Sequence, residues 1–170
     1  MPHLIGPQFH AIASLQVVVA DLEAADLQAQ EVVAARNDIG PVEKVQLIRA
    51  RRGQGLFRIG VHSVERECRV TKVDNVAMLR ASHIKPWRKA SDAEKLDPNN
   101  GLMLSPHVDH LFDDGLITFS GNGQMEISPR LDRDVLARWH IPEVLTVGSF
   151  NQDQRTYLNF HNEEVFLASA

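Results

Sequence analysis

Turn-forming residues divide the middle of this chain into short segments, and no other feature limits its possible folds as much. The breaks fall at Pro86, at residues 97–101 (Asp-Pro-Asn-Asn-Gly), at Gly115 and at residues 120–123 (Ser-Gly-Asn-Gly). Proline lacks the backbone donor that helices and sheets need, and glycine adopts backbone angles that end regular elements. The segments between these breaks are therefore long enough only for short strands and a short helix.

The apolar residues of these segments indicate which elements form. Short runs with strand-like composition are predicted at residues 68–71, 78–84 and 102–104. Ser105 and Pro106 are typical of a helix start, and Gly115 is typical of the residue after a helix end. Residues 116–119 and 125–128 flank a strong hairpin signal. The centre of the chain is thus predicted to be three short strands, a helix and a hairpin.

The two flanks have helical patterns instead. Helices are predicted N-terminally at residues 20–36, 42–50 and 56–67, with Gly53-Gln54-Gly55 as an interruption, and C-terminally at residues 132–139 and 152–167. The fold class is therefore α+β. We expect an N-terminal helical segment at residues 1–43 and a second domain at residues 44–170, whose core spans about residues 68–115.

Composition excludes several classes of protein. With 44% hydrophobic residues the 170-residue chain can bury a core, but no apolar run is long enough to span a membrane. A lone cysteine, Cys68, excludes an internal disulfide and a cysteine-rich zinc site. The N-terminus lacks a basic region followed by an apolar one, so we expect no signal peptide and a cytoplasmic location.

The charges are unevenly distributed. The net charge is −4 for the whole chain, but −5 for residues 1–43, +9 for residues 44–89 and −8 for residues 90–170. A basic block between acidic flanks favours a polyanionic partner, although a solvated basic surface would have the same composition.

The helix expected after Ser105 combines a core-facing side with paired carboxylates. Its apolar face consists of Val108, Leu111 and Phe112. Asp109 and Asp113 are one helical turn apart and repel each other unless a cation joins them. Carboxylates suit Mg²⁺ or Mn²⁺, and the imidazole of His110 extends the range to Zn²⁺ or Ni²⁺. The alternative is a solvated acidic turn.

The order of these residues along the chain resembles that of the HNH nucleases, which share the ββα-metal fold. The resemblance covers about residues 50–130. Its motifs are residues 82–87 (Ser-His-Ile-Lys-Pro-Trp), 100–102 (Asn-Gly-Leu) and 111–113 (Leu-Phe-Asp), preceded by residues 68–71 (Cys-Arg-Val-Thr). It implies a ββα-metal core with an added hairpin and C-terminal helices.

The resemblance also implies an activity, namely metal-dependent hydrolysis of DNA phosphodiester bonds. His83 would be the general base that activates water, and Asn100 would hold the loop and orient His83. One divalent metal, with Mg²⁺ or Mn²⁺ favoured over Zn²⁺ or Ni²⁺, would bind Asp109 and Asp113, with His110 in reserve.

The basic block gains a function from this resemblance, as a surface for the phosphates of double-stranded DNA. The residues that we expect to contact DNA are Arg52, Arg58, Lys85, Arg88 and Lys89. For Arg58 the alternative to a DNA contact is a structural role in supporting the fold. The N-terminal helix has two alternatives, to form a homodimer or to pack on the core.

Four positions depart from the family pattern. Ser82 replaces an acidic residue, Asp109 replaces a histidine, Lys72 replaces a glycine, and Asp114 replaces a basic residue. Two rival functions follow: a nucleic-acid-binding module of the same fold without turnover, and an RNA-directed or toxin-type nuclease. A DNA nuclease of this kind would serve DNA restriction, phage defence or mobile elements.

Overall fold

The computed structural model describes residues 20, 24, 27–28 and 30–169. Contacts divide the chain into two compact units, residues 1–59 and 60–170, and each is described by itself. The described residues 20, 24, 27–28 and 30–35 are helical, as predicted for residues 20–36, whose other residues lie outside the described part. The domain boundary expected after residue 43 stays a prediction.

One prediction for the first half of the chain is wrong. Residues 42–50 and 56–67 do not form separate helices, because α2 runs without a break through Pro41–Val64, including Gly53 and Gly55. A glycine inside a helix costs only about 1 kcal/mol relative to alanine, and the residues around both glycines favour helix. Breaking a long helix would cost several backbone hydrogen bonds, so the helix continues.

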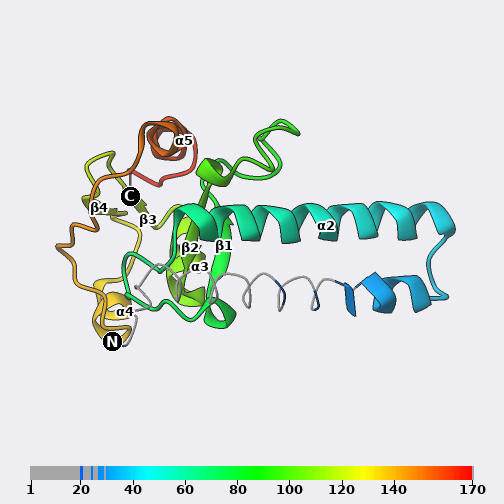
Figure 1. Ribbon diagram of the computed structural model, residues 1–170. Helices are drawn as coiled ribbons and strands as arrows, with labels where there is room; N and C mark the ends of the chain where they lie inside the picture. The colour runs from blue at the N-terminus through cyan, green and yellow to red at the C-terminus, as the bar shows by residue number, and fades with distance from the viewer. Residues whose placement is uncertain (1–19, 21–23, 25–26, 29, 170) are drawn as a thin grey trace, which may run out of the picture. The chain divides into compact units, whose positions relative to one another are not determined.

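The second unit contains the strand–strand–helix core that the turn signals predict. Its elements are the 3₁₀ turn η1 (Val76–Met78), β1 (Arg80–His83), the 3₁₀ turn η2 (Pro98–Asn100), β2 (Gly101–Leu104) and α3 (Pro106–Asp113). The strands β1 and β2 pair antiparallel, with His83 opposite Gly101, and α3 packs on β1 (Figure 1). Val108, Leu111 and Phe112 of α3 are buried, as their spacing predicts.

Residues 68–71 form a tight turn, so the strand predicted there is also wrong. Two backbone hydrogen bonds close this turn, Lys72 N to Cys68 O at 2.8 Å and Cys68 N to Val73 O at 2.8 Å. Lys72 has a φ of 62°, the left-handed conformation that favours glycine. The positive φ of residue 72 explains why a glycine, the residue expected here from the resemblance, would suit this position.

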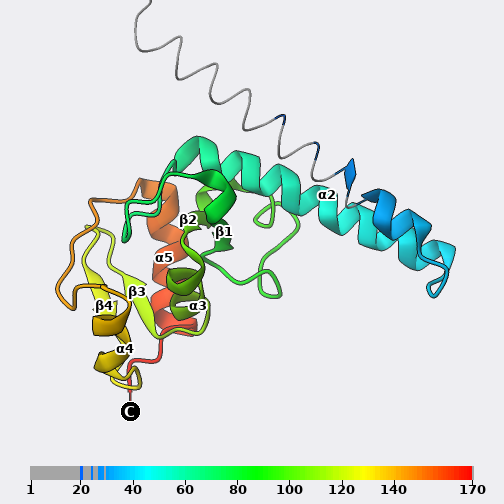
Figure 2. The same cartoon turned by 90° about the horizontal axis from the view of Figure 1, so that it is seen from below.

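The remaining elements follow the predictions closely. They are β3 (Ile117–Phe119), β4 (Met125–Ile127), α4 (Arg133–Arg138) and α5 (Gln152–Glu164). Gly115 has a φ of 67° and ends α3, while β3 and β4 form the predicted hairpin. The helix α5, seen end-on in Figure 1 and lengthwise in Figure 2, packs against β3 and η2.

An aromatic stack joins α3, the hairpin and α5 in the core of the second unit. Phe112 lies 5.9 Å from Phe119, which lies 5.8 Å from Phe150, measured between ring centroids. Phe112 also stacks on the ring of His161, with 3.9 Å between the ring centroids. His161 is buried and bonds to Thr118 Oγ1 and to the Phe112 carbonyl, and burial lowers its pKa to about 4.

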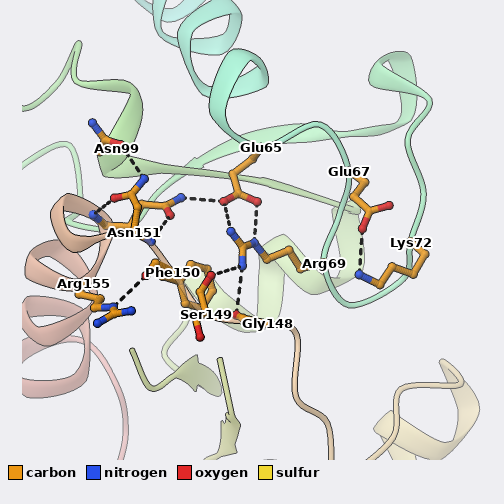
Figure 3. A network of polar contacts seen from close by, with 11 residues as sticks. Glu65, Glu67, Arg69, Lys72, Asn99, Gly148, Ser149, Phe150, Asn151 and Arg155 are labelled. Atoms are coloured by element: carbon orange, nitrogen blue, oxygen red, sulfur yellow. Dashed lines mark hydrogen bonds and ion pairs between the residues drawn. The ribbon is translucent and has the colours of Figure 1, made fainter. Parts of the chain in front are cut away.

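A second buried feature is the carboxylate of Glu65 (Figure 3), which is only 4% exposed. It accepts hydrogen bonds from Nε and Nη2 of Arg69, at 2.7 and 2.6 Å, and from Nε2 of Gln154 at 2.7 Å. Arg69 also donates to the carbonyls of Gly148 and Ser149. Arg69, one of the basic residues of the block, is thus used to hold the fold together.

In the described part of the chain, no helix combines the length and apolar character needed to cross a membrane.

Candidate active site

The acidic pair of α3 faces β1. Arg80 Nη1 lies 3.2 Å from Asp109 Oδ2, and Ser82 Oγ donates to Asp113 Oδ1 at 3.2 Å. Alternate residues of a strand point to the same side, so Arg80 and Ser82 both reach α3. The structure therefore brings Asp109 and Asp113 together beside the residue that precedes His83.

The two carboxylates influence each other. Partial burial and the negative charge of Asp109 raise the pKa of Asp113 above its usual value. Asp109 itself is buried, whereas Arg80 is largely exposed. The pair thus carries more negative charge than its single arginine contact compensates, and this favours a cation.

His110, the histidine of α3 that the sequence predicts as a reserve ligand, makes its contact elsewhere. His110 is exposed, and its Nδ1 lies 3.2 Å from Oδ2 of Asp114. An ion pair with Asp114 forms only when the imidazole is protonated, and a protonated imidazole binds no metal. His110 therefore stays a reserve ligand behind Asp109 and Asp113.

His83 ends β1 and is held by the backbone of the following loop. Its Nε2 lies 3.1 Å from the Lys95 carbonyl oxygen, and its ring meets the ring of Trp87 edge-on at 5.4 Å. Because a carbonyl can only accept, Nε2 carries the proton and Nδ1 is the basic nitrogen. Burial lowers the pKa of His83 below its usual 6.5, against the effect of the Lys95 carbonyl.

Asn100 is fully buried and holds both ends of the loop that contains Lys95. Its Oδ1 accepts from Lys85 N at 2.7 Å, and its Nδ2 donates to the carbonyls of Lys85 and Glu94, at 3.3 and 3.0 Å. The Glu94 carbonyl immediately precedes the residue that accepts from His83. Asn100 thus joins the backbone at residues 85 and 94, and its role in orienting His83 stays a prediction.

The residues expected to contact DNA fall into three groups. Lys85 is largely buried, and its Nζ lies 2.8 Å from both oxygens of Glu94, whose pKa it lowers to about 2. Arg88 and Lys89 are exposed on the loop. Arg52 and Arg58 belong to the first unit, with Arg52 exposed and Arg58 half-buried. Lys85, Arg88 and Lys89 therefore belong to the same unit as His83 and follow it directly in the chain.

Three parts of the site were not identified from the sequence. Arg80 and Ser82 contact the acidic pair, and the Lys95 carbonyl accepts from His83. The two-residue period of β1 could have placed Arg80 and Ser82 on one face. No side-chain pattern could have identified Lys95, because its contribution is a backbone oxygen.

The chemistry of the donors can be tested against a metal ion. Among the residues that the structure describes, no three His, Cys, Asp or Glu side chains come together as a ligand set. Two neighbouring carboxylates do fit Mg²⁺ or Mn²⁺, because such ions usually take one or two carboxylates and complete their shell with water and phosphate oxygens. A structural zinc ion, which needs four protein ligands, does not fit.

Comparison with known proteins identifies this segment. Residues 68–120 match the family model described as HNH endonuclease. The segment therefore belongs to the HNH endonuclease family, and β1, β2 and α3 are its ββα-metal core, as the motifs predicted. The match indicates nuclease-type chemistry, and with it binding of a nucleic acid, for this segment. None of the curated proteins compared with the chain matches it.

Proposed function

We propose that this protein hydrolyses phosphodiester bonds of double-stranded DNA, with His83 as the general base. The observation that carries the proposal is the hydrogen bond between His83 Nε2 and the Lys95 carbonyl. In the tautomer with its proton on Nε2, Nδ1 is the nitrogen that would take the proton of the attacking water, and burial lowers the pKa of His83, which favours a neutral ring at neutral pH.

The carboxylates of Asp109 and Asp113 would hold one divalent ion, Mg²⁺ or Mn²⁺, with His110 in reserve. Bound there, such an ion supplies Lewis-acid stabilisation of the charge that develops on the phosphodiester. Ser82 orients Asp113 through its hydrogen bond, and Arg80 contacts Asp109. Exposed Arg88 and Lys89 supply phosphate contacts that set affinity without reading sequence.

A plasmid-nicking assay with Mg²⁺, Mn²⁺, Ni²⁺ or Zn²⁺ tests the proposal. We expect His83→Ala to lower the cleavage rate by about 10²- to 10⁴-fold, as loss of a general base does. His140→Asn is the matched control, because His140 is exposed and asparagine tolerates its φ of 55°. Equal rates for His83→Ala and the wild type would show that His83 is not the base.

A binding module without turnover is the second candidate, and the Arg80–Asp109 contact favours it. A cation supplied by the chain itself can neutralise the carboxylate in place of a metal. Calorimetric titration with Mn²⁺ separates the two candidates: the nuclease binds the ion and loses it in Asp113→Asn but not in Asp114→Asn. A protein that binds DNA, takes up no metal and cleaves neither plasmid DNA nor structured RNA is the binding module.

A further inference from the structure

The helix α5 lies outside the segment that matches the HNH family, yet it holds the loop on which His83 depends. We define this loop, residues 84–99, as the acceptor loop, because it contains the Lys95 carbonyl that accepts from His83. The family match ends at residue 120, and α5 covers Gln152–Glu164. Its contacts with the acceptor loop are therefore additional to those within the segment that matches the family.

The best-defined contact is made by Tyr157, the single tyrosine of the chain. Its hydroxyl donates to Oδ2 of Asp97 at 2.8 Å, and burial together with this contact raises the pKa of Tyr157. The other oxygen of Asp97, Oδ1, accepts from the backbone N of Asn99 at 2.9 Å. Both oxygens of this carboxylate are thus engaged, one by α5 and one by the loop itself.

Asp97 connects this contact to His83. It lies two residues after Lys95, and its carbonyl accepts from Asn100 N at 3.0 Å. The Nδ2 of Asn100 in turn donates to the Glu94 carbonyl at 3.0 Å. The backbone at Lys95 is therefore fixed on both sides, by Asn100 at residue 94 and by Tyr157 at residue 97.

Further contacts hold the same loop against α5. Asn151, the residue that caps α5, donates from Nδ2 to Asn99 Oδ1 at 3.0 Å (Figure 3). The ammonium of Lys85 lies 5.1 Å and that of Lys89 5.6 Å from the ring centroid of Phe160. These contacts spread over the length of the loop, so α5 acts on the whole loop and Tyr157 on the part nearest Lys95.

We propose that Tyr157 is a positioning residue for His83, acting through Asp97 and the Lys95 carbonyl. This inference rests on the proposed role of His83 as the base. Without the Tyr157 hydroxyl, Asp97 loses its link to α5, and the backbone at Lys95, which the bonds Lys95 N–Ser91 O and Leu96 N–Ala93 O also hold, loses one of its supports. The proton of His83 is then no longer confined to Nε2, and the fraction of rings with a basic Nδ1 falls.

The main test compares Tyr157→Phe with the wild type in the full chain. The phenylalanine keeps the ring and removes only the hydroxyl. We expect kcat for plasmid nicking to fall on the order of tenfold, with KM unchanged, because the acting group is misplaced while DNA contacts remain. Thr156→Ala is the control: Thr156 is exposed on the same helix, and its hydroxyl bonds only within the helix, to the Gln152 carbonyl.

A second measurement needs no cleavage. The ¹⁵N chemical shifts of His83 in the metal-free protein report its tautomer and its pKa. We expect the wild type to hold the proton on Nε2, and Tyr157→Phe to shift towards a mixture of tautomers with an altered pKa. Asp97→Ala should reproduce this change, and the double variant should add nothing to it, because both residues act through one contact.

The outcomes distinguish this inference from the proposed function. If Tyr157→Phe only lowers the unfolding temperature, with the His83 tautomer, its pKa and kcat unchanged, Tyr157 is structural and the inference is wrong. If the wild type cleaves no substrate with any metal, the proposed function fails, while the tautomer measurement still decides whether Tyr157 positions His83. If both kcat and tautomer change in Tyr157→Phe but not in Thr156→Ala, the inference holds.

Discussion

Two carboxylate sites in the second unit differ in how completely their charge is compensated. The Glu65 carboxylate accepts three short hydrogen bonds, two from Arg69 and one from Gln154. Among the residues that the structure describes, Asp109 makes a 3.2 Å contact with the exposed Arg80, and Asp113 accepts from Ser82, also at 3.2 Å. A saturated buried carboxylate stabilises the fold, whereas two loosely held carboxylates one turn apart are suited to bind a cation.

The largest expected effect tests the structural half of this comparison. Glu65→Gln should lower the free energy of unfolding by about 3 kcal/mol, because removing one partner leaves the Arg69 charge without its carboxylate. Urea denaturation measures it. The double variant Glu65→Met, Arg69→Met should recover part of the loss, since replacing both partners with apolar groups leaves no isolated charge. A loss below about 0.5 kcal/mol would place Glu65 among ordinary surface residues.

A smaller effect is expected from another saturated buried group, His161. Its pKa is about 4 in the folded protein and about 6.5 when unfolded, so the unfolded chain binds more protons between these values. Stability is therefore lost as the pH falls through this range. We expect about 2 kcal/mol of loss from this group between pH 7 and pH 5. His161→Gln should remove that part of the pH dependence in parallel urea titrations, and an identical pH dependence in both proteins would contradict the assignment.

Removal of the arginine at the Asp109–Asp113 site should improve the binding of a cation, whereas breaking the Glu65–Arg69 pair destabilises the fold. Arg80→Gln should strengthen Mn²⁺ binding by up to about fivefold, because an exposed ion pair of about 1 kcal/mol no longer competes for Asp109. Calorimetry measures the affinity, and Arg133→Gln, which changes an exposed arginine of α4, is the control. Weaker binding in Arg80→Gln would mean that Arg80 supports the carboxylate pair rather than competing for it.

The smallest expected effect concerns Lys72, which closes the tight turn at residues 68–71. Lys72→Gly should raise the free energy of unfolding by about 0.5–1 kcal/mol, since glycine adopts a φ of 62° without steric cost. The ion pair of Lys72 with Glu67 is exposed, so its loss offsets little. Lys72→Ala serves as the control and should not stabilise the protein. A destabilised Lys72→Gly would show that the lysine contributes more than its backbone angle costs.

The local elements of the second unit were accessible from the sequence because their signals are short-range. Pro106 and Gly115 bound α3, residues 120–123 form the hairpin turn, and the burial of the apolar face of α3 follows from its helical spacing. Predictions failed where contacts of the surrounding structure outweighed the preference of a few neighbouring residues. Gly53 and Gly55 remained inside α2, and residues 68–71 closed into a turn instead of extending into a strand.

What the sequence determined by itself was the order of elements and the identity of the family, since both depend on neighbours in the chain. His83, Asn100, Asp109 and Asp113 could be nominated because their spacing is a local property. Only the tertiary structure decided what each of them contacts. Tyr157 and Asp97 are 60 residues apart in the chain, and the acceptor of His83 is a backbone oxygen that any residue could supply. Partners of this kind leave no pattern in the sequence, because folding alone brings them within hydrogen-bonding distance.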